Sequence, residues 1–368
     1  MFRPTWAEID LSAFQKNAEF LARRAGSRAK LLAVLKADGY GHGAVPLARR
    51  LERRPPPRFW GFGDSSVEEG LALRDAGVKG RILILGSLFP FDSFSAALEK
   101  GLTPTIASLS AAKALAKAAS RRGLRADVHV KVDTGMGRIG MTPETAVERI
   151  PEIAALPSLR LEGVYTHLAN AEDPGRSAGQ LHLFDNIIQS CRARGLSPLV
   201  HAANSAALMG IPQSRYDLVR PGLALYGVPP FSGAGGLLPV MSWKTRVVFL
   251  KTVPKGTFVS YGGIFRATRR SRLATLPVGY ADGYRRAFTG KASVLVKGRR
   301  VPVAGRVTMD QIVVDVTGVP GVDVGEEVVL LGRQGRESVA ASDMAAWADT
   351  IPYEILCGVS RRVPRVCR

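Results

Sequence analysis

The first two-thirds of the chain alternates short apolar runs with longer segments of helical periodicity. An amphipathic helix is predicted over Leu11–Arg24, and helical patterns fill most of the later gaps, as in Ser110–Arg122 and Arg176–Arg194. Strands alternating with helices indicate a parallel sheet, and eight such units in about 230 residues fit a (β/α)8 TIM-type barrel, with a doubly wound sheet as the alternative. The predicted strands are Leu31–Lys36, Arg58–Gly63, Arg81–Gly86, Leu102–Ala107, Ala126–Asp133, Leu161–His167, Leu199–Asn204 and Leu218–Tyr226.

The pattern changes after Pro229. The stretch Pro229–Pro239 is rich in glycine and proline and is typical of a linker. We expect a hairpin turn at Lys297-Gly298 and one clear helix over Ser342–Asp349. The chain is therefore predicted to be an α/β protein with a barrel over residues 1–235 and a C-terminal mostly-β domain over residues 236–368. The strands predicted there are Lys244–Val253, Arg272–Val278, Ala292–Val296, Ile312–Val316 and Glu327–Leu331.

Length and composition agree with two globular domains. The chain has 368 residues, of which 46% are hydrophobic and 22% charged. No stretch reaches the ~20 apolar residues of a membrane helix, and no secretion signal opens the sequence, so we expect a cytoplasmic protein that does not enter membranes. The three cysteines do not have metal-ligand spacing, so we predict no metal site. Cys357 and Cys367 could pair in principle, and we expect free thiols in a reducing cytoplasm.

The formal net charge of +20 raises the question of a nucleic-acid partner. Arginine pairs such as Arg23-Arg24, Arg121-Arg122 and Arg361-Arg362 recur along the whole chain, and no aromatic residues alternate with them. This distribution indicates a solvated basic surface rather than a nucleic-acid interface.

Candidate chemistry lies where predicted barrel strands end, because active sites of such barrels form at that edge. Lys36 ends the first strand, where burial would make its amine nucleophilic, although a lysine reaching from a strand end to solvent is the simpler reading. Loops after strands seven and eight often bind phosphate, and they carry Ser205 and Gly222 here. A phosphate site opposite a strand-end lysine is the layout of a pyridoxal-phosphate pocket. Further candidates stand at other strand ends. Lys131, Asp133 and Arg138 could bind a ligand or form an ordinary ion pair in a loop. His167 could be catalytic or a hydrogen-bonded core histidine.

Nine segments together resemble the alanine racemase family, in order and over nearly the whole chain. Gly39 and Thr308 depart from the residues common in that family, and neither removes a catalytic group. The segments are Ala33–Gly43, Lys131–Gly140, Tyr165–Asp173, His201–Ala207, Arg220–Gly227, Val259–Phe265, Val278–Tyr284, Gly305–Gln311 and Thr350–Cys357.

The resemblance implies a two-base racemisation of alanine. Lys36 would carry pyridoxal phosphate as a Schiff base and act as one acid/base, and Tyr261 would act as the other on the opposite face. Arg220 would face the pyridine nitrogen and leave it unprotonated, because arginine holds its proton. His167 would link Tyr261 with Arg220. The other cofactor ligands implied are Tyr40, Arg138, Ser205, Gly222, Leu223 and Tyr353.

The resemblance also implies a homodimer with shared active sites and a role in supplying D-alanine for peptidoglycan. Arg138 and Met309 would bind the substrate carboxylate, with Tyr261 and Met309 coming from the partner, and a carbamylated Lys131 would position Arg138. Residues at the substrate entrance would be Tyr280, Arg306 and Asp310. The alternatives are a racemase of broader amino-acid specificity, a related decarboxylase and a non-enzymatic pyridoxal-phosphate carrier.

Overall fold

The computed structural model describes residues 3–368, which form two compact units. One unit comprises Phe14–Gly39 and Ala44–Leu238. The other joins the N-terminal segment up to Ala13 with Tyr40–Gly43 and Pro239–Arg368. Two separate hydrophobic cores are expected for a chain of this length.

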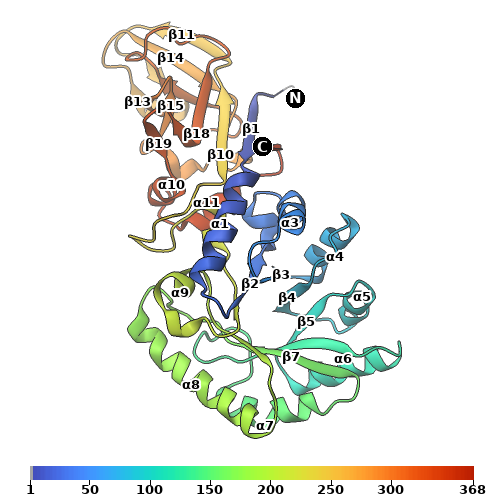
Figure 1. Ribbon diagram of the computed structural model, residues 1–368. Coiled ribbons are helices and arrows are strands. Elements are labelled where there is room, and N and C mark those ends of the chain that lie inside the picture. The colour runs from blue at the N-terminus through green and yellow to red at the C-terminus, as the bar shows by residue number, and fades with distance from the viewer. Residues whose placement is uncertain (1–2) are drawn as a thin grey trace. The chain divides into compact units, whose positions relative to one another are not determined.

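The first unit is built on a parallel sheet of eight strands that curls into a barrel (Figure 1). The strands are paired in chain order from β2 to β8, and β9 pairs with β2. Beside β8 and β9, the Asp217 amide donates to the Val200 carbonyl (3.0 Å) and the Arg220 amide to the Ala203 carbonyl (2.9 Å), which closes the barrel. The predicted barrel is confirmed. Its strands are β2 (Lys30–Val34), β3 (Phe59–Asp64), β4 (Ile82–Ser87), β5 (Thr103–Ile106), β6 (Ala126–Lys131), β7 (Leu159–Tyr165), β8 (Leu199–His201) and β9 (Leu218–Val219).

Helices follow the barrel strands, and local sequence fixes where several of them begin. In α7 the Thr142 side chain caps the Thr145 amide, and Ala146, Ile150 and Ile153 form the buried face. None of the helices within residues 3–368 is long and apolar enough to cross a membrane. The helices of this part of the chain are α1 (Leu11–Arg24), α2 (Lys36–Tyr40), α3 (Ala44–Arg53), α4 (Val67–Asp75), α5 (Ser93–Glu99), α6 (Leu109–Ser120), α7 (Pro143–Ala154), α8 (Pro174–Ala193) and α9 (Ser205–Gly210), with 3-10 turns η1 (Pro212–Ser214) and η2 (Leu223–Tyr226).

The eighth predicted strand is much shorter than expected. It ends at Val219, and the apolar residues after Gly222 form the buried 3-10 turn η2 instead. Pro221 cannot donate to a strand ladder, which explains why the strand stops there. An apolar run alone does not distinguish a buried strand from a buried turn.

The second unit is mostly β structure. Its main sheet has the order β16-β15-β18-β10-β1-β20, with β19 paired to β18; β11-β14-β17 form a second sheet and β12-β13 a short hairpin. The strands are β1 (Thr5–Ile9), β10 (Met241–Arg246), β11 (Phe249–Val253), β12 (Phe258–Val259), β13 (Phe265–Arg266), β14 (Ser271–Leu276), β15 (Ser293–Val296), β16 (Arg299–Pro302), β17 (Ile312–Asp315), β18 (Glu327–Gln334), β19 (Glu337–Val339) and β20 (Arg365–Cys367). The remaining elements are α10 (Ala341–Trp347), α11 (Pro352–Gly358) and the 3-10 turns η3 (Tyr261–Gly263), η4 (Tyr280–Asp282) and η5 (Arg286–Phe288).

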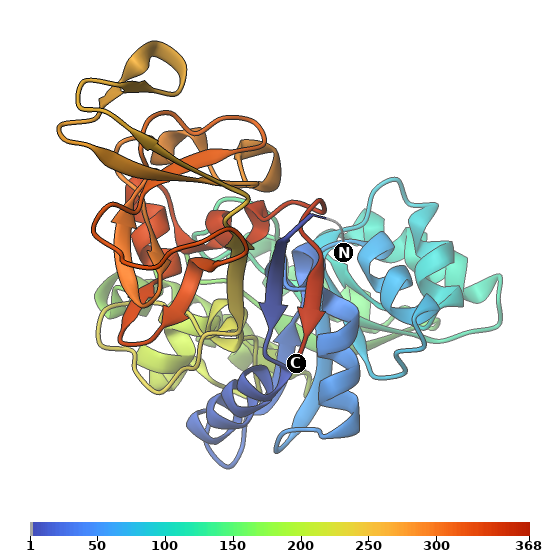
Figure 2. The same ribbon diagram turned by 90° about the horizontal axis from the view of Figure 1, so that it is seen from above.

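The N-terminal strand departs from the expected domain division. β1 pairs antiparallel with β10 and parallel with β20, so Figure 2 shows the N-terminal and C-terminal strands side by side. Its Ala7 and Ile9 side chains are fully buried, and Glu8 forms ion pairs with Lys244 and Arg368. The first residues of the predicted 1–235 barrel therefore belong to the β unit, because their apolar face is buried in its sheet.

Two further predictions for the β unit need correction. The predicted strand Lys244–Val253 is two strands, because the chain leaves β10 after Arg246 and begins β11 at Phe249. A second helix, α11, follows α10; Pro352 stands at its first position, where proline is tolerated. The hairpin at Lys297-Gly298 is confirmed by the pairing of β15 with β16.

Candidate active site

Lys36 lies just beyond the first barrel strand, at the start of a left-handed turn. β2 ends at Val34, and Ala37, Asp38 and Gly39 have φ values of 55°, 51° and 63°. Left-handed backbone is costly for residues with a Cβ, so surrounding groups must hold it.

Two carboxylates stabilise this turn. The Ala37 amide donates to Oε1 of Glu69 at 2.7 Å, and the Ala44 amide donates to Oδ1 of Asp38 at 2.8 Å. The Gly39 amide also donates to the Leu35 carbonyl at 2.6 Å. The backbone that carries Lys36 is therefore fixed by contacts on both sides of the lysine, and Glu69 is a residue that the sequence analysis did not single out.

A cluster of cationic side chains lies in the barrel unit. Lys131 ends β6 and Arg220 follows β9, and both are almost fully buried. Burial, together with the positive charges of Arg220, Arg138 and Lys36, lowers the pKa of Lys131 from 10.5 to about 8, against an opposing effect of Asp133. Burial lowers the pKa of Arg220 to about 10. This concentration of buried positive charge favours an anionic ligand.

Arg220 is held by three hydrogen bonds. Nη1 contacts Nδ1 of His201 at 2.8 Å, and Nη2 donates to the carbonyls of Thr166 and Ala202 at 2.7 and 3.0 Å. The guanidinium also lies 5.0 Å from the Tyr165 ring centroid, which is within range of a cation–π contact. These contacts fix the orientation of the Arg220 side chain.

A chain of polar contacts runs from Arg220 through the barrel interior. Nε2 of His201 is 2.8 Å from Nδ1 of His129, whose Nε2 is 3.3 Å from Oε2 of Glu162. Burial lowers the pKa of both histidines, so both are neutral. Since arginine can only donate, each ring accepts on Nδ1 and donates from Nε2, and Glu162 is the final acceptor. Glu162 in turn pairs with Arg81.

The imidazole hydrogen-bonded to Nη1 of Arg220 is that of His201, which the sequence did not single out. The link expected from His167 between Tyr261 and Arg220 stays a prediction. Burial, and then the nearby cations led by Arg220, lower the pKa of His167 to about 3, so its ring is neutral. His129 was missed altogether. Its position two residues before Lys131 on β6 places both side chains on the same face of the strand, and this spacing could have identified it.

Arg138 is carried by a loop that folds around one carboxylate. Asp133 accepts hydrogen bonds from the backbone amides of residues 135, 136, 137 and 138 at 2.7–3.1 Å. These bonds hold the pKa of Asp133 below its usual value despite its desolvation. These bonds fix the backbone that carries Arg138, whose positive charge contributes to the lowered pKa of Lys131.

Ser205 and Gly222 come together as the sequence analysis predicted. The Ser205 hydroxyl accepts hydrogen bonds from the amides of Gly222 (3.0 Å) and Ala224 (3.2 Å), and all of these groups are buried. Asn204 caps α9 through the Ala207 amide, so Ser205 is the first residue of that helix. Leu223 opens η2 between the two amides. A hydroxyl, converging backbone N–H groups and a helix start are the donor set of a phosphate site.

The remaining predicted residues lie in the β unit. A pocket of about 580 Å³ is lined by the second proposed base together with the predicted substrate and entrance residues. Tyr261 and Met309 are 71% and 52% exposed. The Tyr261 carbonyl accepts from Nε of Arg306 at 3.0 Å. The members of this group are Tyr261, Tyr280, Arg306, Met309 and Asp310.

Tyr40 and Tyr353 form a second pair in this unit. Their rings are 5.9 Å apart, and burial raises the pKa of the Tyr40 hydroxyl, so it is a neutral hydrogen-bonding group. The carbonyl of Gly41 accepts from Nε of Arg365 at 2.9 Å, which fixes the backbone beside Tyr40. Within residues 3–368, no group of three or more metal-ligating side chains could hold a metal ion.

Comparison with known proteins identifies the family. A model of the alanine racemase N-terminal domain matches residues 9–230, and a model of the C-terminal domain matches residues 240–367. The alanine racemases of Symbiobacterium thermophilum and Halothermothrix orenii are 46% and 43% identical to this chain, covering 99% of it and 97% and 96% of the relatives.

Solved structures agree with this match. An alanine racemase of Clostridium difficile superposes with a TM-score of 0.93 at 36% identity, over 100% of this chain and 96% of that one. The alanine racemase of Streptomyces coelicolor gives 0.92 at 38% identity, over 99% and 98% of the two chains. The chain therefore belongs to the alanine racemase family.

Proposed function

We propose that this protein interconverts L-alanine and D-alanine with pyridoxal phosphate as its cofactor, and that Lys36 and Tyr261 are its two bases. The observation that carries the proposal is the buried cationic cluster of the barrel, in which Lys131 and Arg220 lie within electrostatic reach of Lys36 and Arg138. Family membership supports the same conclusion. The product D-alanine would serve peptidoglycan synthesis.

The barrel residues fit this cofactor. The phosphate would be held by the Ser205 hydroxyl and the adjacent amides of Gly222 and Leu223. Lys36 would bind the aldehyde carbon, and Arg220 would face the pyridine nitrogen. The ring supplies an electron sink that makes the α-hydrogen of a bound amino acid acidic. The buried positive charge of Lys131 and Arg220 fits an anionic cofactor and substrate.

The two proposed bases move the proton. The α-carbon of the amino acid would lose its hydrogen on one face to one base, either Nζ of Lys36 or the Tyr261 phenolate oxygen. The other of these two bases would then donate a proton to the α-carbon on the opposite face. Inversion requires donors on both faces, because a single base returns the proton to the side it left. Arg220 keeps its proton at neutral pH, since its pKa of about 10 is still well above 7.

The lowered pKa of Lys131 supports its proposed carbamylation. At a pKa of about 8 a useful fraction of the amine is unprotonated near neutrality. The amine nitrogen would bond to the carbon of CO₂ and release a proton, giving an anionic carbamate beside Arg138. This change would replace one buried positive charge by a negative one and so position Arg138 for the substrate carboxylate.

We also propose a homodimer in which each barrel is completed by the β unit of a second copy. Tyr261 and Met309 are strongly exposed on their own unit, although a catalytic phenol works in a water-poor site. Burial against a second chain would resolve this conflict. The three cysteines are free thiols, which fits the cytoplasm as the place of action.

Chiral chromatography tests the proposal. The purified protein with pyridoxal phosphate is incubated separately with L-alanine, L-serine, L-lysine and L-arginine. D-alanine as the dominant product, absent with Lys36→Ala, is the expected result. Comparable D-serine or D-lysine would indicate a racemase of broader specificity. Loss of carboxyl carbon as CO₂ would indicate a decarboxylase, and no reaction despite bound cofactor would leave a carrier.

A further inference from the structure

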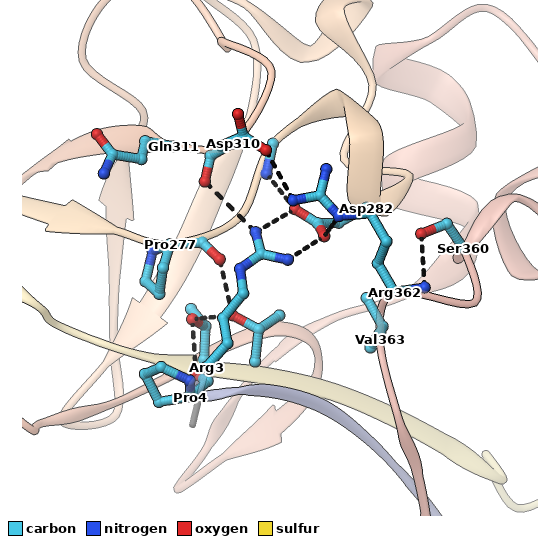
Figure 3. Close-up of polar contacts among 12 residues, drawn as sticks. Arg3, Pro4, Pro277, Asp282, Asp310, Gln311, Ser360, Arg362 and Val363 are labelled. Atoms are coloured by element: carbon cyan, nitrogen blue, oxygen red, sulfur yellow. Dashed lines mark hydrogen bonds and ion pairs between the residues drawn. The ribbon is translucent and has the colours of Figure 1, made fainter. Parts of the chain in front are cut away.

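A buried carboxylate in the β unit is clamped between two arginines from the two ends of the chain (Figure 3). Asp282 closes the turn η4 and is fully buried. Arg3 binds both of its carboxylate oxygens, with Nη2 at 2.6 Å from Oδ2, and Nε of Arg362 lies 3.5 Å from Oδ1. None of these three residues takes part in the chemistry proposed above.

The same two arginines reach the loop that carries Met309. Nη2 of Arg362 lies 2.7 Å from Oδ1 of Asp310, and Nη2 of Arg3 is 3.5 Å from the Asp310 carbonyl (Figure 3). Asp310 is 55% exposed at its side chain, so the network runs from a buried carboxylate to the wall of the pocket.

Backbone contacts join the turn to this loop directly. The Tyr280 amide donates to the Thr308 carbonyl and the Ala281 amide to the Met309 carbonyl, both at 3.0 Å. Oδ2 of Asp282 accepts from the Gly279 amide at 2.9 Å. A methyl group on Gly279 would collide with the carbonyls of Thr308 and Met309. The turn and the loop therefore move as one body, and the position of Asp282 sets the position of both.

We propose that Asp282, Arg3 and Arg362 are positioning residues that set the substrate-binding geometry of Tyr280, Met309 and Asp310. This inference rests on the proposed function, in which those three pocket residues contact the substrate or its entrance. Arg3 and Arg362 form ion pairs with the Asp282 carboxylate. That carboxylate accepts from the Gly279 amide and so fixes the turn η4. Arg362 also forms an ion pair with Asp310. Substrate affinity should therefore depend on charges that lie outside the substrate contacts themselves.

Arg362 gives the sharpest test, because it is partly exposed and its replacement leaves the buried Arg3–Asp282 pair intact. Arg362→Gln should raise the KM for alanine about tenfold with a smaller change in kcat, as expected for loss of a charged contact that orients a binding loop. Arg362→Lys should recover part of the loss. Arg361→Gln, which alters the exposed neighbouring arginine, is the matched control and should behave as wild type.

Hydrogen exchange separates this inference from the proposed function. Peptides covering residues 305–313 should exchange faster in Arg362→Gln than in Arg361→Gln, whether or not the protein racemises alanine, while barrel peptides and cofactor absorbance stay unchanged. Wild-type KM together with unchanged exchange in Arg362→Gln would overturn the inference. An inactive wild type would refute the proposed function, and the exchange data alone would then decide whether Arg362 positions the loop.

Discussion

Asp64 offers a prediction in which the sign and size of a pH effect follow from the structure. It ends β3 inside the barrel and is 1% exposed, and neither carboxylate oxygen has a hydrogen-bond partner within residues 3–368. Burial, and secondarily the charge of Glu69, raise its pKa from 3.8 to about 7. The folded protein thus binds this proton more tightly than the unfolded chain does.

The stabilising effect of that proton is complete below pH 3.8 and is lost as the pH rises through about 7. Since one pKa unit corresponds to about 1.4 kcal/mol, the wild-type protein should lose about 3 kcal/mol of unfolding free energy through Asp64 between pH 5 and pH 8. Asp64→Asn removes the titrating group and keeps the shape. The variant should therefore gain stability relative to wild type as the pH rises.

Thermal unfolding at pH 5 and pH 8 measures this effect. The Tm of Asp64→Asn minus that of wild type should increase by roughly 6–12 °C between the two pH values, at about 2–4 °C per kcal/mol. Asp92→Asn, which alters an exposed aspartate in the same unit, should show no such change. An equal Tm difference at both pH values would refute the reasoning and mean that Asp64 is ionised and solvated in the fold.

Three further predictions concern the barrel site. His201→Ala leaves the buried Arg220 guanidinium without one acceptor, and differential scanning fluorimetry should show a loss of about 2–3 kcal/mol; a loss below 0.5 kcal/mol would contradict the contact. Removing CO₂ and bicarbonate should lower activity reversibly if Lys131 is carbamylated, whereas unchanged activity together with an unmodified lysine by mass spectrometry would exclude it. Ser205→Ala should weaken pyridoxal-phosphate binding about tenfold or more by titration, because the phosphate would lose the Ser205 hydroxyl as a hydrogen-bond donor; unaltered affinity would remove Ser205 from the phosphate site.

Much of the barrel could be predicted because its signals are local. Seven of the predicted strands coincide closely with β2 to β8, since each apolar run is short and bounded by turn or helix signals. The placement of β1 could not be predicted, because its partners β10 and β20 lie more than 230 residues away in the sequence. Strand pairing over such distances leaves no local pattern.

Some contacts of the candidate site could be predicted from the sequence, and others could not. Ser205 and Gly222 were brought together correctly because barrel geometry places successive strand ends at one edge. The bond from Arg220 to His201 was missed, since sequence order does not tell which imidazole points toward the guanidinium. The clamp of Arg3 and Arg362 on Asp282 joins three distant segments and had no sequence signal.

The two-base mechanism is tested most directly by α-hydrogen exchange in deuterium oxide with Tyr261→Phe. The variant keeps Lys36 and the cofactor pocket but lacks a proton carrier on one face. Racemisation should be lost in this variant, while the α-hydrogen of one enantiomer of alanine, and not the other, should still exchange with solvent. Racemisation at the wild-type rate, or exchange of both enantiomers at equal rates, would contradict the account and leave a single base serving both faces.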